Sequence, residues 1–256
     1  MQYASMLEGG TPVEFVRRPR PPRNEGNGKR KPNELRPVFM SLGTVAKAAG
    51  SAYIEVGGSK LLCSVYGPRP DPKADYVSET GRLSCNVKVA PFAGVEVPAE
   101  LEKELPLLVK PALEPAVVLS RFPKSVVEIH ILVLEQEGDV VSAAITCASL
   151  AMADAEIEMF DLVAASSVAV HSRKSSTEMQ VDPSSQDVAA QSGSMLAAMM
   201  PSRGEVTQLS HVGEWEPAQF EAAMELGVAA CKQVHGLMRR GLIEAAEGSV
   251  QKQPPA

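Results

Sequence analysis

The chain has 256 residues, of which 45% are hydrophobic and 22% are charged, values typical of a globular protein with a substantial core. No apolar run approaches the roughly 20 residues that a membrane-spanning helix requires, and the first fifteen residues lack the basic start and apolar stretch of a signal peptide. The net charge of −6 argues against strong unaided binding of nucleic acid, because contacts with phosphates dominate such binding.

The positive charge is concentrated near the N-terminus. Residues 17–36 carry eight Arg and Lys residues and two Glu residues, a net charge of +6, which leaves −12 on the rest of the chain. Residues 1–33 are rich in Pro, Gly, Arg and Lys, so we expect a disordered basic arm. We interpret its charge as that of a solvated tail, with RNA contact as the alternative. Residues 247–256 are polar and end in Pro-Pro-Ala, which indicates a flexible tail.

The first predicted element is a β-hairpin. Two runs with alternating apolar residues, Ala52–Val56 and Lys60–Tyr66, flank Gly57-Gly58-Ser59, which is typical of two strands joined by a tight turn. The alternating run Leu83–Val89 predicts another strand.

The middle of the chain predicts a strand between two helices. Residues 99–119 place Leu and Ala at helical spacing but contain three prolines, which predict kinks or a break. Val126–Leu134 is a largely apolar run that predicts a buried strand. Residues 142–159 are dominated by Ala, so this predicted helix can lie close against a sheet.

The last third predicts the remaining elements of one domain. We expect a strand at Leu162–Val170, a hairpin formed by Ser194–Met200 and Glu205–Ser210, and a helix over residues 216–246. This succession of strands and helices indicates a single α+β or α/β domain over residues 34–246, with a mixed sheet packed with helices.

Few residues form a pattern that carries chemistry. Four cysteines are widely spaced in apolar segments, and we expect free buried thiols rather than disulfides or zinc. His130 lies in an apolar strand and is interpreted as structural, and the other histidines lack the spacing of metal ligands. An acidic cluster at residues 154–161 is interpreted as a solvated helix end. Phosphate-loop and dinucleotide fingerprints are absent from the sequence, so no cofactor and no metal site are expected.

An ordered set of short motifs resembles the RNase PH superfamily, which comprises bacterial RNase PH, polynucleotide phosphorylase and the ring subunits of the RNA exosome. The resemblance runs from residue 33 to 246 and implies the RNase PH-like fold, also described as ribosomal protein S5 domain 2-like. The full set of motifs is Arg36-Pro37, Gly50–Glu55, Gly57–Lys60, Gly67-Pro-Arg69, Ala90–Gly94, Leu113–Ala116, Val133-Leu134 with Gly138, Ala143–Ile145, Met159–Leu162 and Asp182-Pro183. Four of them, those that begin at Gly50, Gly67, Ala90 and Asp182, most resemble a eukaryotic ring subunit of the mRNA-transport-regulator type.

Active members of this superfamily cleave RNA from its 3′ end with phosphate as the nucleophile, and the resemblance allows their site to be compared. The segment that carries their first phosphate-binding arginine, residues 94–104 here, contains four Glu, one Lys and no Arg. Their second such arginine aligns with Val141, which can neither attract nor hydrogen-bond phosphate. Asp182 matches the first acidic residue of their carboxylate motif and Asp187 a later one, but the next position is Val188. We therefore expect no catalytic residue, with Asp182 a vestige that serves as a turn residue.

The resemblance thus implies a non-catalytic subunit of an exosome ring that scaffolds 3′-to-5′ RNA processing and degradation. The alternative is an active phosphate-dependent 3′-to-5′ exoribonuclease, alone or with a site shared with a partner subunit. The implied partners are other RNase PH-like subunits, a cap subunit with an S1 domain and single-stranded RNA, with no membrane. The implied location is the nucleus, including the nucleolus, and the cytoplasm. For RNA contact, the candidates are Arg69, Arg82 and Lys88.

Overall fold

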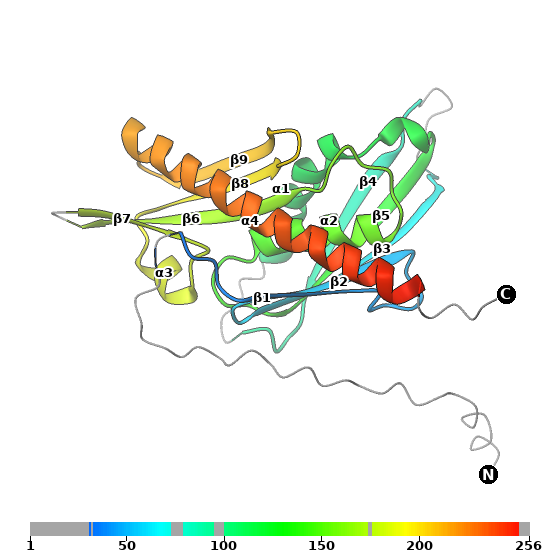
Figure 1. Ribbon diagram of the computed structural model, residues 1–256, viewed down its shortest axis with the longest axis horizontal. Coiled ribbons are helices and arrows are strands. Elements are labelled where there is room, and N and C mark those ends of the chain that lie inside the picture. Colours follow the sequence, from blue (N-terminus) through cyan, green and yellow to red (C-terminus); the bar gives the residue numbers. More distant parts are fainter. Residues whose placement is uncertain (1–30, 32, 73–78, 95–99, 174–175, 251–256) are drawn as a thin grey trace, which may run out of the picture.

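The computed structural model describes residues 31, 33–72, 79–94, 100–173 and 176–250 (Figure 1). The arm predicted over residues 1–33 lies outside these residues, apart from Lys31 and Asn33. The described part of the predicted C-terminal tail, residues 247–250, forms the end of a helix.

The described residues form an α+β arrangement. The helices are α1 (Leu101–Leu113), α2 (Val141–Asp154), α3 (Ser185–Ala190) and α4 (Pro217–Val250), with the short 3-10 helices η1 (Glu114–Ala116) and η2 (Leu119–Arg121). The strands are β1 (Val38–Leu42), β2 (Gly50–Val56), β3 (Ser59–Pro70), β4 (Arg82–Val89), β5 (Ser125–Glu135), β6 (Ala164–Arg173), β7 (Ser176–Val181), β8 (Gly193–Met200) and β9 (Glu205–Gly213).

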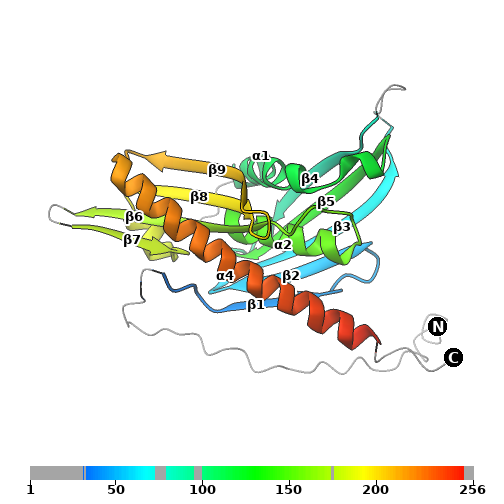
Figure 2. The ribbon, with the colours of Figure 1, turned by 45° about the horizontal axis from the view of Figure 1, so that its top comes forward.

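The strands form two sheets rather than the single sheet predicted from the sequence. The first sheet has the order β1-β2-β3-β5-β4 and is mixed, because β4 runs parallel to β5 while the other neighbours are antiparallel. The second sheet, β7-β6-β8-β9, is antiparallel. Figure 1 shows α4 running diagonally across both sheets, and Figure 2 shows β9 at the outer edge of the second.

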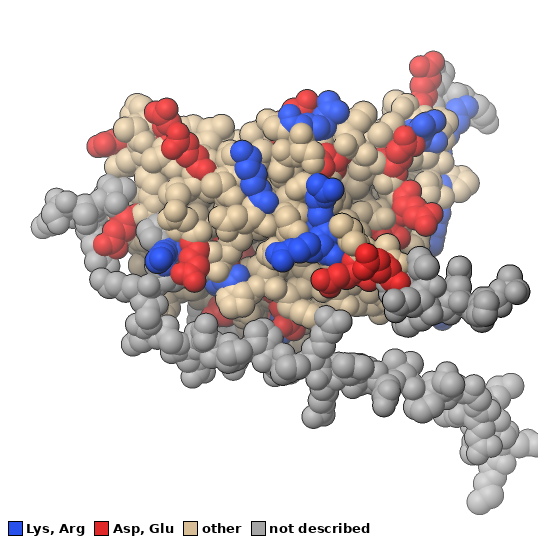
Figure 3. Space-filling view, in the orientation of Figure 1, with Lys and Arg blue, Asp and Glu red and all other residues tan. Residues whose placement is uncertain are grey.

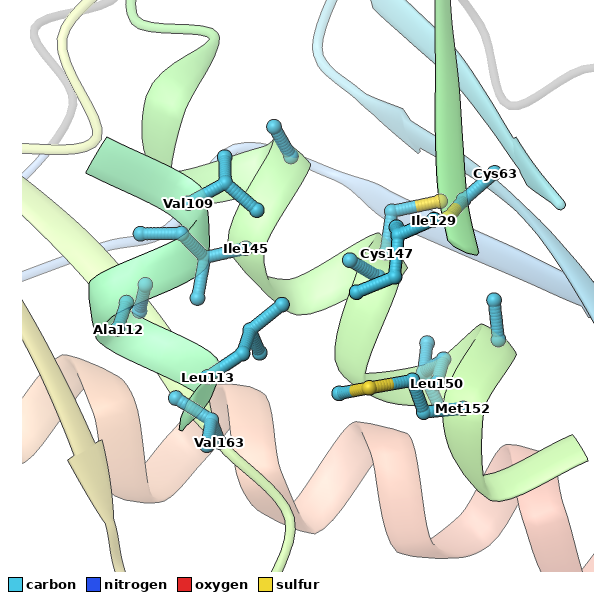
Figure 4. Packing of buried hydrophobic residues seen from close by; sticks show 14 of the residues in the cluster. Cys63, Val109, Ala112, Leu113, Ile129, Ile145, Cys147, Leu150, Met152 and Val163 are labelled. Carbon is cyan, nitrogen blue, oxygen red and sulfur yellow. The ribbon is translucent and has the colours of Figure 1, made fainter. Parts of the chain in front are cut away.

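The small residues of α2 allow this helix to lie against the first sheet. Eleven of its residues are buried, four of them Ala. The approach is closest at Gly50, where an added Cβ would lie 2.1 Å from the backbone nitrogen of Ala155. Figure 4 shows Ile145 and Leu150 of α2 among side chains from α1 and the strands. One hydrophobic cluster thereby joins residues of both sheets.

Most predicted elements are present with shifted ends. The hairpin of β2 and β3, the strands β4, β5 and β6, and the hairpin of β8 and β9 are confirmed. The helix predicted over residues 99–119 continues through Pro106 and Pro111 but ends at Leu113, and Pro115 lies in η1. The helix predicted over residues 142–159 ends five residues early, at Asp154. The short elements β1, β7 and α3 were not predicted from the sequence.

Strand β5 is buried on one face only, contrary to its prediction as a buried strand. Its burial alternates because helices cover a single face of the first sheet. His130 lies on the other face, with a side chain 43% exposed, and packs edge-on against Tyr66 at 5.6 Å between ring centroids.

All four cysteines are free thiols, as predicted from their spacing. Cys63, Cys147 and Cys231 are buried and Cys85 is partly buried; Figure 4 shows the first two within the core. Burial raises the pKa of Cys63 well above its usual range and raises those of Cys85 and Cys231 to about 11. These three groups are therefore neutral, unreactive thiols at neutral pH.

Candidate functional site

Asp182 is a buried carboxylate that is fully engaged by Arg36. Its Oδ1 accepts a hydrogen bond of 2.6 Å from Nη2 of Arg36, and its Oδ2 accepts one of 3.0 Å from the backbone nitrogen of the same residue. The side chains of Arg36 and Asp182 are 8% and 7% exposed. Asp182 itself follows β7 with a φ of 51° and donates its N–H to Ser167. Its charge is thus balanced by a structural ion pair.

The space beside Asp182 is too small for a nucleotide. The cavity has a volume of about 20 Å³ and is lined by residues of β1, β2, α2, β6 and α4 together with Asp182. A volume of this size holds about one water molecule, whereas ligand sites for small molecules measure hundreds of Å³.

The turn before α2 packs directly against the Asp182 segment. Nη1 of Arg36 donates a hydrogen bond of 2.7 Å to the carbonyl of Glu137. Gly138, with a φ of 83°, lies so close that an added Cβ would meet the carbonyl of Pro183 at 2.2 Å. Its N–H donates to Ser185 Oγ at 2.9 Å. The structure therefore does bring together the segments that align with the second arginine and the carboxylate motif.

An internal carboxylate occupies the N-terminus of α2. The carboxylate of Asp139 accepts hydrogen bonds from the backbone N–H groups of Val141 (3.3 Å) and Ser142 (3.2 Å). Free amides at a helix N-terminus are suited to bind phosphate, but here a carboxylate of the chain itself already accepts hydrogen bonds from two of them. The side chain of Val141 adds no cation.

The remaining acidic residue of this region also has a structural partner. Asp187 accepts a hydrogen bond from the N–H of Ser184 (2.9 Å), and its own N–H donates to Ser184 Oγ (3.4 Å), which together form the capping box of α3. Val188 follows on α3 and is 36% exposed. The Asp182 cluster (Arg36, Asp139, Asp182 and Asp187) carries one positive and three negative formal charges, which would repel phosphate.

The acidic segment that precedes α1 is only partly described, since residues 95–99 lie outside the described ranges. Glu102 accepts hydrogen bonds from the N–H of Val89 (2.9 Å) and from Nζ of Lys88 (3.1 Å). These two hydrogen bonds lower the pKa of Glu102 below its ordinary value of 4.5, and the bond from Val89 has the larger effect. Glu102 thus connects α1 to β4.

Two of the three predicted RNA-contact residues lie together. Arg69 of β3 and Arg82 of β4 both pair in register with Val126 of β5, so they flank one end of that strand. Arg69 lies 5.3 Å above the ring of Tyr66 and 3.9 Å from the Glu128 carboxylate. Arg82 is paired with Asp71 at 2.8 Å, which raises the pKa of Arg82.

The third, Lys88, lies elsewhere on the first sheet. It pairs with Leu132, six residues along β5 and thus about 20 Å from Val126. Its side chain is 76% exposed and bonded to Glu102. Each of the three cations therefore has an acidic neighbour, and Figure 3 likewise shows basic and acidic side chains interspersed on the face that carries α4.

The acidic cluster after α2 is solvated only in part: Glu156 and Glu158 are exposed, as interpreted from sequence, whereas Asp154 and Asp161 bond other segments. Asp154 accepts a hydrogen bond from the N–H of Ser51 at 2.7 Å. Asp161 accepts two from Ser202, through its N–H (2.8 Å) and hydroxyl (3.0 Å). These carboxylates satisfy polar groups of distant segments that the sequence order does not place nearby. Among the described residues, no three His, Cys, Asp or Glu side chains form a group suited to a metal ion.

Sequence reasoning missed two residues that decide the state of this site. From the sequence, Arg36 counts only among the basic residues of segment 17–36 and in the motif Arg36-Pro37, whereas in the structure it is the buried partner of Asp182. Asp139 follows the motif residue Gly138 and was not singled out from the sequence. Asp139 stands two residues before Val141, the first residue of α2, and an Asp at the start of an apolar run is the usual sequence signal for a helix N-terminus, which could have identified it.

The fold and this site define an α+β protein in which segments far apart in the sequence meet around the buried Arg36–Asp182 pair. The chain matches the family "3' exoribonuclease family, domain 1" over residues 34–158. It is 38% identical to "Exosome complex component RRP41-like" of Arabidopsis thaliana, with 85% of this chain and 84% of the relative covered.

A human relative, "Exosome complex component MTR3", is 35% identical, with 87% of this chain and 88% of the relative covered. The "Exosome complex component Rrp41" of Methanopyrus kandleri is 34% identical, with 86% of this chain and 92% of the relative covered. The chain belongs to the RNase PH family. The fold agrees, since the crystal structure of rice Rrp46 superimposes with a TM-score of 0.73 over 82% of this chain and 97% of that one, at 21% identity.

Among the described helices, none has both the length and the apolar character that a membrane crossing requires.

Proposed function

We propose that this protein is a non-catalytic RNase PH-like subunit of an RNA exosome ring. The observation that carries the proposal is the Asp182 cluster: its carboxylates are held by Arg36, by the N-terminus of α2 and by the α3 capping box. In active relatives a cation at the Val141 position would hold phosphate, and a bidentate arginine contact cannot be replaced by an alkyl group. Names of relatives that describe exosome components support the ring assignment.

The role in the ring would be to complete the assembly, to line part of the RNA channel and to offer a surface to an S1-domain cap subunit. The relatives include both RRP41-like and MTR3 proteins, and we favour the mRNA-transport-regulator type, whose motifs the sequence resembles. Such a subunit would act in RNA processing and turnover in the nucleus, including the nucleolus, and in the cytoplasm.

The rival function is phosphate-dependent 3′-to-5′ exoribonuclease activity, and the family description and the Rrp41 relatives favour it. The purified chain, incubated with single-stranded RNA, phosphate and Mg²⁺, should release no nucleoside diphosphate, while an active family member assayed in parallel should do so. If the chain does release nucleoside diphosphate, and the release is lost in Val141→Glu, the non-catalytic proposal is wrong. Val141→Glu suits this purpose because an acidic residue is tolerated in the first turn of a helix but would repel phosphate.

We also propose that Arg69, Arg82 and Lys88 contact RNA in the assembled ring. Arg69 and Arg82 flank Val126 of β5, Arg69 lies over the partly buried ring of Tyr66, and aromatic rings next to cations are suited to contact single-stranded RNA. Replacing Arg69 and Arg82 by alanine in the reconstituted ring should lower RNA crosslinking more than replacing the distant Lys88. Unchanged crosslinking in the triple variant would remove this surface from the proposal.

A further inference from the structure

An open groove lies between residues 31–35 and helix α4. It has a volume of about 820 Å³, and its lining includes Lys31, Leu35, Gln233, Leu237 and Arg240. Sites that bind small ligands measure roughly 300–1,000 Å³. Unlike the space beside the Arg36–Asp182 pair, this groove is therefore large enough to hold a ligand.

The first wall of the groove is a turn that is fixed by hydrogen bonds. The N–H of Lys31 donates to Glu34 Oε2 at 3.3 Å, and the N–H of Glu34 donates to the carbonyl of Lys31 at 3.0 Å. The same carbonyl accepts a hydrogen bond of 3.3 Å from Nε2 of Gln180 in β7. Leu35 follows the turn and packs against both hydrophobic clusters of the domain. This wall is therefore formed without a ligand.

The second wall is one side of α4. Gln233, Leu237 and Arg240 are spaced by four and three residues, so they lie on the same side of the helix. Met238 belongs to the main hydrophobic cluster, whereas Leu237 is partly buried and belongs to neither of the two clusters that the described residues form. Leu237 thus has an aliphatic side chain available for contact with a ligand.

The charge of the groove is mainly positive. Lys31 and Arg240 are exposed, and the described part of the chain provides no ion-pair partner for either side chain. Glu34 is the one acidic residue of the described lining, and its carboxylate accepts the N–H of Lys31. The sequence adds two further cations, Lys29 and Arg30, directly before Lys31. Figure 3 shows basic side chains over the middle of α4. The groove is therefore complementary to an acidic ligand.

The lining favours a peptide over a nucleic acid. Proteins bind single-stranded RNA largely by stacking its bases on aromatic rings, and none of the described residues that line this groove is aromatic. Leu35 and Leu237 suit aliphatic side chains instead, and the amides of Asn33 and Gln233 can hydrogen-bond an extended backbone. We infer that the groove binds an acidic segment of a partner protein, in which aliphatic residues are interspersed with Asp and Glu. This inference goes beyond the proposed function and does not depend on it, because the groove is formed by this chain alone.

The test is the binding of a fluorescein-labelled peptide, Asp-Glu-Leu-Asp-Leu-Glu-Asp, to the full chain in about 0.1 M salt, followed by fluorescence anisotropy. Binding should be saturable. Arg240→Glu should weaken it about fivefold or more, because an attraction becomes a repulsion. Leu237→Ser, which leaves the charge unchanged, should weaken it by a similar factor. The matched control is Arg239→Glu, which makes the same charge change at the adjacent exposed residue of α4 outside the groove lining and should have less than about a twofold effect.

The contrary results identify what is wrong. Equal losses in Arg240→Glu and Arg239→Glu, with none in Leu237→Ser, would show attraction by net charge alone and overturn the groove site. Absence of saturable peptide binding by the wild-type chain also overturns it. If labelled oligouridine displaces the peptide and its own binding is lost in Arg240→Glu, the occupant is RNA and the inference is wrong. Thermal unfolding verifies that each variant is folded. The proposed function is tested separately, by the release of nucleoside diphosphate.

Discussion

Asp182 shows how burial changes the role of a carboxylate. Its sequence position alone matches the first acidic residue of a catalytic motif. In the structure both of its oxygens accept hydrogen bonds from Arg36, and the pair is more than nine-tenths buried. A buried ion pair contributes little net stability, but removing one partner leaves the other as an uncompensated buried charge.

Asp182→Ala should therefore destabilise the protein by about 3–5 kcal/mol, measured by urea unfolding. The double variant Arg36→Met/Asp182→Leu should recover most of this loss, because apolar residues of similar volume replace a buried pair well. As a control, Asp187→Ala removes only the capping box of α3 and should cost about 1 kcal/mol. Wild-type stability in Asp182→Ala would contradict the structural role of the pair.

At the scale of elements, carboxylates join segments that lie far apart in the chain. Glu102 of α1 holds the end of β4 through Val89 and Lys88, and Asp161 holds the turn between β8 and β9 through Ser202.

Strong periodicity allowed β2, β3, β5 and α4 to be predicted. The short elements β1, β7 and α3 carry too few residues for a periodic signal, and α3 depends on its capping box.

The contribution of Glu102 should depend on pH. Because the folded state lowers its pKa below 4.5, the stabilisation is fully present above pH 4.5 and is lost as the pH falls through the lowered value. Glu102→Gln should thus lower the unfolding temperature at pH 7 and have little effect near pH 3. Glu104→Gln, at an exposed position of the same helix, provides the control and should change the unfolding temperature at neither pH. An equal effect of Glu102→Gln at both pH values would show that the charge is not responsible.

At the scale of the whole molecule, two sheets share one core. The main hydrophobic cluster contains Ile54 and Ile129 of the first sheet, Ala164 and Met199 of the second, and residues of α1, α2 and α4. The long α4 contacts strands of both sheets. A shared core of this kind couples the sheets, so that neither can lose its packing alone.

We therefore expect both sheets to unfold together. Trp215 is the single tryptophan and lies beside β9, where its Nε1 donates to the carbonyl of Val212. Its fluorescence reports on the second sheet, whereas far-ultraviolet circular dichroism reports on the entire fold. The two urea transitions should coincide, and separate midpoints would indicate that the sheets are independent units.

The sequence by itself determined the family and the order of the major elements, because these depend on residue types at successive positions along the chain. Only the tertiary structure decided the partners of the site residues and which strands lie at the edges of the sheets. Arg36 and Asp182 are 146 residues apart, and no local sequence pattern indicates that they form an ion pair. Likewise, β9 is an edge because of the order in which strands pair. Its exposed Val212 resembles any apolar strand residue until the position of the strand in the sheet is known.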